Sequence, residues 1–412
     1  MTKTKKITII LIVAIVVLAI IAFVFLSLHK KDKIIPTKEE LKPTEYKAVK
    51  LEDGSEIINY GTCTSKNADE ICYLVVKEAM MTLRNSKVIK EDGEATNIEE
   101  SINNGLNSAI LATYGTIAKI ENSKVSTSAN GSAAFFVNGT KAEGEINNST
   151  IETLNTFSPA VVATNNAYIK VDHLNASTKV KSSPVVKTLK EKSIIELKNS
   201  NLESNGSLSP LVESSGEVKI IDSTGAANAS RMADIKNNGK VIIENSSMLV
   251  SGGEDDYGSS AVLITSTNKD NNAIFQSINS SLNINQNLPY YKIAPFFIVD
   301  NAIAEIDIEN TALNFGSNKL LKATNSDIII NLKNQTIYGE IENIDSTIQM
   351  NLYENSSYTG AIKDNVSIYL SKDSELNLTG DTNLKELKND DSTNNNITLN
   401  GYHLYVNGEL IK

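Results

Sequence analysis

The sequence contains no tryptophan, only 6% aromatic residues, and two arginines in 412 residues. A chain so poor in aromatics needs a core built from many thin layers of small aliphatic side chains, which suits short stacked strands. The net charge of −10 argues against a nucleic-acid partner, because nucleic-acid binding needs a basic face. Composition therefore favours a repeat architecture. In such an architecture the length of the chain does not indicate the number of domains.

Cysteine is almost as rare, since Cys63 and Cys72 are the two in the chain. Their spacing is not that of a zinc site, and no histidine lies near them in the sequence. In an oxidising, extracytoplasmic location they would form a disulfide between neighbouring strands, which would contribute about 2–3 kcal/mol in the chain-entropy model. The alternative is two free thiols without a role. An extracytoplasmic location of this part of the chain would favour the disulfide, which we therefore predict.

A single long apolar stretch, residues 7–28, contains no charged residue. A helix over this stretch, rising about 1.5 Å per residue, is long enough to cross the roughly 30 Å hydrocarbon core of a membrane. The stretch is long for a cleaved signal peptide, has no small-x-small cleavage site before Lys30, and has lysines on both sides, unlike a buried helix. We therefore predict a transmembrane signal anchor at 7–28, behind a cytoplasmic basic tail at 1–6.

Residues 29–50 contain Pro36 and Pro43 among lysines and glutamates, with no apolar period. This composition predicts a solvated linker. Lysines flank the apolar stretch almost equally on both sides, so the positive-inside rule alone does not fix its orientation. A basic start, an immediate apolar run and a long polar remainder are typical of a signal anchor whose C-terminal bulk is exported. The expected location is the cell membrane, crossed once, with most of the chain extracytoplasmic.

The remainder of the chain, residues 51–412, repeats one pattern. A small-residue turn and a short apolar run open each copy, as at 107–111 and 131–135, and an alternating strand ends it in Asn-Ser, as at 120–123. The copies recur with a period in the twenties, which is a signature of solenoid proteins. We predict that the recurring Asn is a structural turn position. It stands at Asn122, Asn148, Asn199, Asn245, Asn279 and Asn310.

These features predict an all-β fold whose coils stack as a parallel β-helix solenoid. Each coil is too short to bury its own apolar face, but strands about 4.8 Å apart in neighbouring coils would enclose rows of apolar side chains. Asn suits the corner because it tolerates left-handed backbone and its side chain can pair with its copy one coil away. We expect roughly 13–15 coils in a rod on the order of 60–70 Å long. Two Asn-Gly pairs, at 400–401 and 407–408, predict a capping hairpin over residues 397–412.

The segments 107–111, 158–162, 120–123 and 243–246 resemble those of right-handed parallel β-helix surface proteins of the pectin-lyase-like class, which includes autotransporter-passenger and adhesin-like β-helices of bacteria. The resemblance covers residues 51–412 and concerns architecture and repeat style. It implies a right-handed β-helix with a binding role at a cell surface. The chain lacks the C-terminal translocation domain of autotransporters and a Leu-Pro-x-Thr-Gly sorting signal, so we expect export to depend on the N-terminal segment.

The resemblance also implies polysaccharide lyases and hydrolases as the main enzymatic alternative. Such lyases place acidic residues around Ca²⁺ and use an Arg or Lys base, and the hydrolases combine clustered Asp with His and Arg. In this chain Arg84 and Arg231 lie many coils apart. The three histidines, His29, His173 and His403, do not share a face of the predicted solenoid with a second catalytic-type residue. We therefore predict no catalytic residue, no cofactor and no enzymatic activity.

Two inserted loops contain the candidate ligand sites. The first has three adjacent carboxylates that could bind Ca²⁺ through oxygen, and a solvated surface loop is the alternative. The second has a tyrosine pair that could stack on sugars, and the alternative is a role in capping a coil. The candidate residues are Glu254, Asp255, Asp256 and Tyr257 in the first loop, and Tyr290 and Tyr291 in the second.

The leading hypothesis is a membrane-anchored, extracytoplasmic β-helix that binds a carbohydrate or another cell surface in the manner of an adhesin. The apolar anchor, the linker, the predicted rigid rod and the missing catalytic pattern favour it. A structural rod that self-associates on the membrane is the second reading, although a terminal hairpin would oppose end-to-end joining. A glycan-cleaving enzyme is the third.

Overall fold

A computed structural model of the chain describes residues 46–253, 255–268, 270–362 and 365–411. The predicted basic tail, membrane anchor and most of the predicted linker, residues 1–45, lie outside the described residues. In the described ranges we find no helix with the length and apolar character that crossing a membrane requires. Residues from Tyr46 onward form one compact unit.

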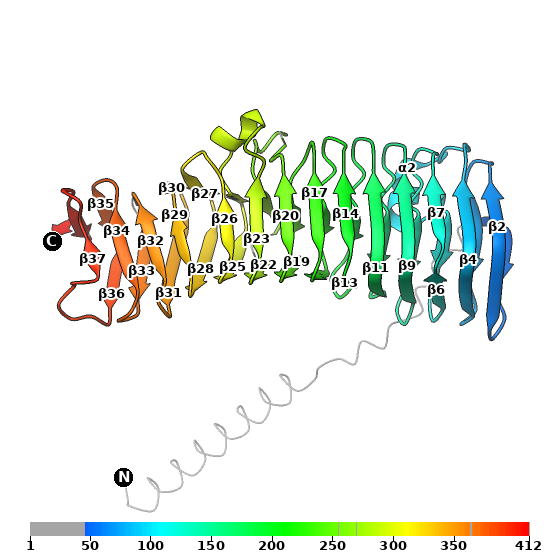
Figure 1. Cartoon of the computed structure of the whole chain (residues 1–412), viewed down its shortest axis with the longest axis horizontal. Helices are drawn as coiled ribbons and strands as arrows, with labels where there is room; N and C mark the ends of the chain where they lie inside the picture. The colour runs from blue at the N-terminus through cyan, green and yellow to red at the C-terminus, as the bar shows by residue number, and fades with distance from the viewer. Residues whose placement is uncertain (1–45, 254, 269, 363–364, 412) are drawn as a thin grey trace, which may run out of the picture. The chain divides into compact units, whose positions relative to one another are not determined.

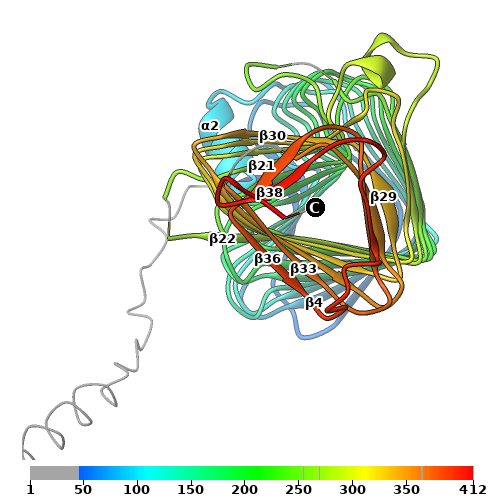
Figure 2. The same cartoon turned by 90° about the vertical axis from the view of Figure 1, so that its left-hand side faces the viewer.

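This unit is a β-solenoid, in which long parallel sheets run the length of a stack of coils (Figures 1 and 2). Most coils contribute one strand to sheet A, then a strand to the first arm of sheet B, and then, beyond a tight corner, a strand to the second arm of sheet B. The strands pair in register with the same strand of the next coil, as Val161 does with Phe135 on one side and Val186 on the other. The predicted all-β parallel repeat is therefore confirmed.

Sheet A has twelve parallel strands. They are β1 Lys47–Glu52, β3 Glu70–Val75, β5 Ile110–Ala112, β8 Phe135–Asn138, β10 Val161–Thr164, β12 Val186–Thr188, β15 Val212–Ser214, β18 Ala233–Lys236, β21 Val262–Thr265, β24 Phe297–Asp300, β27 Lys319–Thr324 and β30 Glu340–Ile344.

The first arm of sheet B precedes the corner in each coil, and four of its strands, β2, β4, β9 and β11, continue through the corner into the second arm. The strands are β2 Ile57–Ser65, β4 Met80–Lys90, β6 Ile117–Glu121, β9 Glu143–Thr153, β11 Tyr168–Thr178, β13 Ile194–Lys198, β16 Glu217–Ile221, β19 Lys240–Glu244, β22 Asn272–Ile278, β25 Ile303–Glu309, β28 Asp327–Lys333, β31 Thr347–Tyr353, β33 Val366–Leu370 and β36 Glu386–Asn389.

The second arm follows the corner, and a small sheet C takes the same place in the C-terminal coils. The separate strands of the second arm are β7 Lys124–Thr127, β14 Asn201–Ser204, β17 Thr224–Ala227, β20 Ser247–Val250, β23 Ser281–Ile284 and β26 Ala312–Asn314. Sheet C consists of β29 Thr336–Tyr338, β32 Ser357–Gly360, β34 Glu375–Leu378 and β37 Ile397–Thr398.

The interior of the solenoid is a column of aliphatic layers, because side chains alternate across each strand and one face of every strand points inward. Leu83, Ile120, Ile146, Val171 and Leu197 occupy one such column on five successive strands, and each is at most 1% exposed. The same strands present charged residues outward. The outer column next to it is Lys119, Glu145, Lys170, Glu196 and Lys219.

A short helix, α2 Ile98–Asn104, and a second small core cover the outer face of sheet A near its start. Leu111, Phe136 and Val162 point away from the interior there and are buried in this second core. The helix begins at Asn97, whose side chain accepts a hydrogen bond from the Glu100 amide, and Ser101 donates to the Gly131 carbonyl. The other helical segment of the described chain is a single 3₁₀ turn, η1 Pro289–Lys292.

The recurring Asn residues are the corner of the coil, as predicted. Their φ angles lie between 45° and 49°, in the left-handed region that Asn tolerates better than other side chains. The pairing between neighbouring copies occurs at Asn310, whose amide nitrogen donates to Asn279 Oδ1 at 2.8 Å. Two other residue types also fill the slot with positive φ, His173 at 55° and Asp222 at 49°.

The Ser that follows each corner Asn forms a ladder along the solenoid. The amide of Ser123 donates to Ser149 Oγ at 3.1 Å, and the amide of Ser200 to Ser223 Oγ at 3.0 Å. Because these groups are buried, each hydroxyl satisfies a backbone donor that would otherwise have no partner. The ladder continues through Ser246, Ser280, Thr311, Gln335, Ser356 and Ser374, and is interrupted where Leu174 takes the slot.

The small-residue turns that open each copy form a second ladder at another corner, through their Ser residues. The amide of Ser158 donates to Ser183 Oγ at 3.0 Å, and the amide of Ser183 to Ser209 Oγ at 2.9 Å. Both recurring Ser slots are therefore columns of hydrogen bonds between coils.

The N-terminal end of the solenoid is closed by a polar layer. β1 begins at Lys47, inside the segment predicted to be linker, and Lys50 and Glu52 occupy positions that face the interior. Lys50 Nζ donates to Tyr73 Oη at 3.0 Å, and Asn59 of β2 donates to Glu52 at 3.0 Å. These polar side chains cover the apolar layer beneath them, which is the role of a terminal capping repeat.

The C-terminal end is covered by the small sheet D, formed by β35 Thr382–Leu384, β38 Leu404–Val406 and β39 Glu409–Leu410. β38 and β39 pair antiparallel around Asn407 and Gly408, so the second Asn-Gly pair makes the predicted hairpin. The first pair, at 400–401, instead joins β37 of sheet C to β38 of sheet D, so the hairpin is shorter than predicted.

The two cysteines are buried free thiols, in contrast to the disulfide predicted from their spacing. Cys63 on β2 and Cys72 on β3 belong to consecutive strands and both point into the interior. The hydrogen bond between the two thiols and the burial of Cys72 raise the pKa of Cys72, which keeps it protonated. Cys72 Sγ also lies 3.4 Å from the Ile89 carbonyl oxygen.

Because the two thiols are hydrogen-bond partners, they lie close enough to react with each other on oxidation. We expect that mild oxidation of the purified protein removes both thiols from reaction with a maleimide under denaturing conditions, and that reductant restores two per chain. Thiol counting by mass spectrometry checks this. Two reactive thiols after oxidation would contradict the predicted disulfide.

The Ser ladder predicts a local stability effect. Ser223→Ala removes the acceptor of the Ser200 amide and leaves that buried donor without a partner, so the free energy of unfolding should fall by about 1–3 kcal/mol. Ser247→Ala, at an exposed position beside the corner of the next coil, is the matched control and should change it by less than about 0.5 kcal/mol. Urea unfolding followed by circular dichroism measures both. Equal effects of the two substitutions would exclude a stabilising ladder.

Candidate functional site

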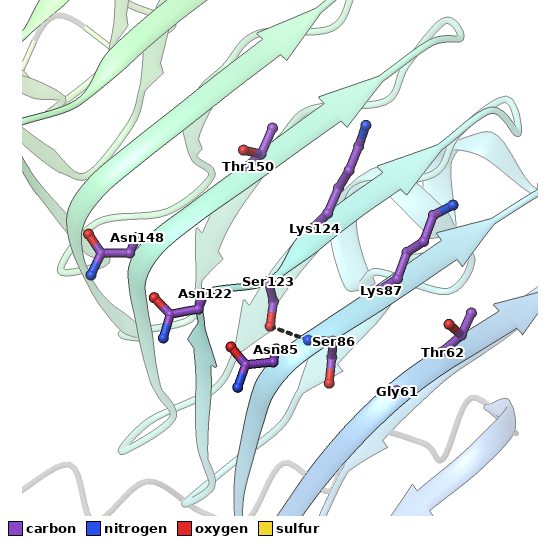
Figure 3. A pocket seen from close by; sticks show the side chains of 10 residues that line it. All are labelled: Gly61, Thr62, Asn85, Ser86, Lys87, Asn122, Ser123, Lys124, Asn148 and Thr150. Carbon is purple, nitrogen blue, oxygen red and sulfur yellow. Dashed lines mark hydrogen bonds between the residues drawn. The ribbon is translucent and has the colours of Figure 1, made fainter.

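Two grooves lie along the Asn corner of sheet B. The N-terminal groove has a volume of about 500 Å³ and is formed by the first coils (Figure 3). The C-terminal groove has a volume of about 1000 Å³ and extends over the coils from Asp222 to Tyr338. The coils of His173 and Asn199 separate the two, so both grooves belong to one strip along the solenoid.

The corner geometry creates these grooves. A left-handed residue turns the chain sharply, the following Ser buries its hydroxyl in the ladder, and the next residue points outward again. Figure 3 shows the result in the N-terminal groove, where Asn85, Asn122 and Asn148 form one row and Lys87 and Lys124 begin a second row. Thr150 continues the second row in the next coil.

The C-terminal groove is polar and almost uncharged. Its exposed rows contain amides at Asn245, Asn279 and Asn310 and hydroxyls in the second row, and Asp222 is the one charged residue of its lining. The hydroxyl row is formed by Thr224, Ser247 and Ser281, is interrupted by Ala312 in the next coil, and resumes at Thr336. Amides and hydroxyls both donate and accept hydrogen bonds, so the groove can bind a ligand rich in hydroxyl groups.

One end of the C-terminal groove carries an aromatic ring. Tyr338 is 39% exposed, and its ring stacks on Phe315 with centroids 4.9 Å apart and planes within 6°. The Tyr338 hydroxyl donates to the Phe315 carbonyl at 2.7 Å, which fixes the ring. A fixed, half-exposed aromatic ring beside hydrogen-bonding groups is suited to stacking against an apolar face of a ligand.

The loop that was a candidate for calcium binding is tied to an arginine. Arg231 is 3% exposed, and its Nη1 and Nη2 donate to the two carboxylate oxygens of Asp255, the Nη2–Oδ1 distance being 2.7 Å. Its other nitrogens reach Ser260 Oγ at 2.9 Å and the Gly258 carbonyl. Asp255 therefore holds the loop on sheet A, and both of its oxygens are already used.

The other two carboxylates that were candidates for binding calcium do not form a metal site in the described residues. Asp256 is exposed on the surface, and Glu254 lies outside the described residues. Among the residues that the structure describes, no group of three metal-binding side chains comes together. The sequence offered a solvated surface loop as the alternative, and the structure shows a surface segment that is held by an ion pair to Arg231.

Arg231 also belongs to a buried charged cluster on the outer face of sheet A. Glu213 and Asp234 are partners in register on β15 and β18. Burial works to raise the pKa of Glu213, but Lys187 and Lys236 outweigh it and lower this pKa to about 2. At Asp234 burial wins over the attraction of Arg231 and raises the pKa to about 6. Oδ1 of Asp234 is buried without a hydrogen-bond partner, at 3.6 Å from Arg231 Nη1.

The predicted tyrosines take structural positions. Tyr290 and Tyr291 lie in η1 and are half-buried against the edge of the core, which fits the capping role. Tyr291 donates to Asn314 Oδ1 at 3.2 Å and covers Gly316 so closely that any side chain there would overlap its ring. Tyr257 is 46% exposed on the Arg231-bound loop.

The residues considered for catalysis are dispersed. His173 occupies the corner slot and its Nδ1 lies 2.9 Å from Asp172, while His403 lies 3.2 Å from Asp381 at the C-terminal end. Arg84 is paired with Glu121 at 2.8 Å on the outer face of sheet B. The structure brings none of these together with a second catalytic pair in the described part of the chain.

The structure also shows site residues that sequence reasoning missed. Lys87 and Lys124 follow the corner Asn-Ser in two successive copies, and the repeated Asn-Ser-Lys tripeptide was a signal that could have found them. Tyr338 had no such signal, because its partner Phe315 lies on the preceding coil.

No family model matches the chain, and no curated protein matches it either. Its function is therefore inferred from the arrangement of its own residues.

The buried acid of the charged cluster gives a pH prediction. Because the folded pKa of Asp234, about 6, exceeds the usual value of about 3.9, this group stabilises the fold below about pH 4 and its contribution is lost as pH rises through 6. Asp234→Asn should therefore raise the free energy of unfolding at pH 7, on the order of 2 kcal/mol, with little gain at pH 4.

Urea titrations at pH 4, 5, 6 and 7 measure this difference. The exposed Asp270→Asn is the control and should show no such trend with pH. A variant less stable than the wild type at pH 7 would show instead that the Asp234–Arg231 attraction exceeds the cost of burying the carboxylate.

Proposed function

We propose that the protein is a membrane-anchored, extracytoplasmic β-helix that binds a polysaccharide in the manner of an adhesin. The observation that carries the proposal is the C-terminal groove, with its parallel rows of amides and hydroxyls along the Asn corner. The sugar units of a linear polysaccharide repeat their hydroxyl groups along the chain, so a periodic row of donors and acceptors is a fitting counterpart.

The direction of the rows supports an extended ligand. Neighbouring coils are about 4.8 Å apart, and Asn245, Asn279 and Asn310 present one amide per coil in a line parallel to the solenoid axis. A compact small molecule would contact two or three coils, whereas this groove spans more. Its openness to solvent also suits a chain that enters and leaves along the surface.

The aromatic end of the groove adds a second kind of contact. Sugar rings have apolar faces, and the exposed ring of Tyr338 offers a flat apolar surface at the end of the polar rows. Hydrogen bonds along the groove and one stacking contact at its end would together fix the position of the ligand.

The proposed location rests on the sequence. The apolar stretch at 7–28 and the linker that begins at 29 support a signal anchor with the solenoid outside the membrane. We also propose that the coils are right-handed and related to the pectin-lyase-like class, since crossover connections between parallel strands are right-handed in about 98% of cases.

The other two readings receive less support. End-to-end assembly would bury the charged side chains of Lys50 and Glu52 at the N-terminal end and would have to accommodate the hairpin of β38 and β39 at the C-terminal end. Glycan cleavage needs an acid and a base on one face, and the described residues contain no such pair beside the grooves.

A glycan array with the full chain in nonionic detergent tests the proposal. The wild type should retain at least one linear polysaccharide, and Ser247→Glu with Ser281→Glu, which places two charges in the groove, should weaken that binding at least tenfold, or about 1.4 kcal/mol. The control, Asn272→Glu with Asn395→Glu, adds the same charge at exposed sites away from the corner and should bind like the wild type. The proposal fails if no glycan is retained or if both double variants bind alike.

A further inference from the structure

Charged residues on this solenoid face residues of opposite charge in the next coil. Lys170 has Glu145 and Glu196 as its partners in register, and Lys187 lies 2.9 Å from Glu213. Because neighbouring coils are about 4.8 Å apart, charges at matching positions act on each other strongly, and like charges there are destabilising. Further ion pairs between neighbouring coils are Arg84–Glu121, Lys119–Glu145, Lys219–Glu244 and Lys333–Glu309.

Lys87 and Lys124 depart from this rule. They are partners in register on β4 and β7, and they form the one lysine–lysine pair among the strand pairs of the described residues. Both side chains are exposed, and neither has an ion-pair partner in the described part of the chain. Figure 3 shows the two side chains extending in the same direction from adjacent strands, above the row of corner Asn.

The surroundings of the two lysines do not neutralise them. Thr62 and Thr150 flank them in the same column, and the other lining residues of the N-terminal groove are Gly, Ser and Asn. Glu152 lies on the same face, in the next coil, two residues after Thr150, which is the partner of Lys124 in register. It forms no ion pair with Lys124 in the described structure.

An acidic pair in register shows how the protein treats such a conflict when no ligand is involved. Glu213 and Asp234 face each other on β15 and β18, and the chain supplies Lys187, Lys236 and Arg231 against them. The lysine pair has no comparable counter-charge from the chain. An anionic ligand would supply the missing negative charge.

We infer that the N-terminal groove binds an anionic group of the polysaccharide, a carboxylate or sulfate on a sugar ring, between Nζ of Lys87 and Nζ of Lys124. The inference rests on the proposed function and names its ligand class, an acidic polysaccharide. The amides of Asn85 and Asn122 beneath the lysines bind the hydroxyls of the same sugar. The C-terminal groove, on the same strip, then takes an uncharged part of the chain.

Binding of three ligands by the full chain in nonionic detergent tests this: a polyuronate, a sulfated dextran and unmodified dextran. The wild type should prefer one or both anionic polymers to dextran at least tenfold, and the affinity should fall as sodium chloride rises from 50 to 500 mM. Lys87→Gln with Lys124→Gln should lose at least tenfold in anionic affinity and most of its salt dependence. The carboxylate and sulfate arms identify which anion is bound.

The control is Lys170→Gln with Lys198→Gln, which removes the same total charge at exposed lysines whose partners in register include carboxylates. It should bind the anionic polymers within about twofold of the wild type. Equal losses in both double variants would assign the effect to net charge and overturn the inference. Equal affinity of the wild type for dextran and the anionic polymers would overturn it while leaving the proposed function in place.

Two further outcomes are decisive. If none of the three polymers nor any glycan on the array is retained, the proposed function itself fails and the inference with it. If vesicles of anionic lipid bind through Lys87 and Lys124 whereas no polymer does, the groove recognises a membrane surface and the polysaccharide inference is wrong.

Discussion

The structure depends on one hydrogen bond that recurs at the corner of most coils. A left-handed Asn turns the chain, and the amide of the next residue, already buried, donates to the hydroxyl of Ser in the following coil, as Ser200 does to Ser223. A buried amide without a partner costs about 1–3 kcal/mol, so most coils place a Ser or Thr at this slot, Gln335 supplies an amide oxygen in one coil, and Leu174 interrupts the series in another. The same bond aligns neighbouring coils, because it forms only when their corners coincide.

This alignment explains why exposed side chains beside the corner form regular rows along the solenoid. Since the residue after each ladder Ser points outward, the fold presents one exposed side chain per coil in a straight row, whatever its identity. In the first coils that row holds Lys87 and Lys124, and in later coils it holds Thr224, Ser247 and Ser281. The chemistry of the strip therefore changes along the rod while its geometry stays constant, which suits recognition of a long ligand with chemically different parts.

The recurrent elements were predictable from the sequence because the same physical demand repeats in every coil, so Asn245 and Ser183 have visible copies. Contacts that occur only once in the structure leave no repeated pattern in the sequence. Asp255 looked like part of a calcium site because its partner Arg231 lies in the preceding coil, and β1 looked like linker because Lys50 and Glu52 stand at positions that are apolar in other coils. The site was predicted less well than the fold, since Tyr338 acquires its role from contact with Phe315 and the two lysines from their register.

The acidic character of the chain does not oppose an acidic ligand at the N-terminal groove. At physiological ionic strength charges are screened over about 8 Å, so distant carboxylates contribute little at an exposed site. The nearest charged face of sheet B is largely neutralised by its own ion pairs, such as Lys119–Glu145 and Arg84–Glu121. The lining of the N-terminal groove itself contains two positive charges, Lys87 and Lys124, and no carboxylate, so the lining is positively charged.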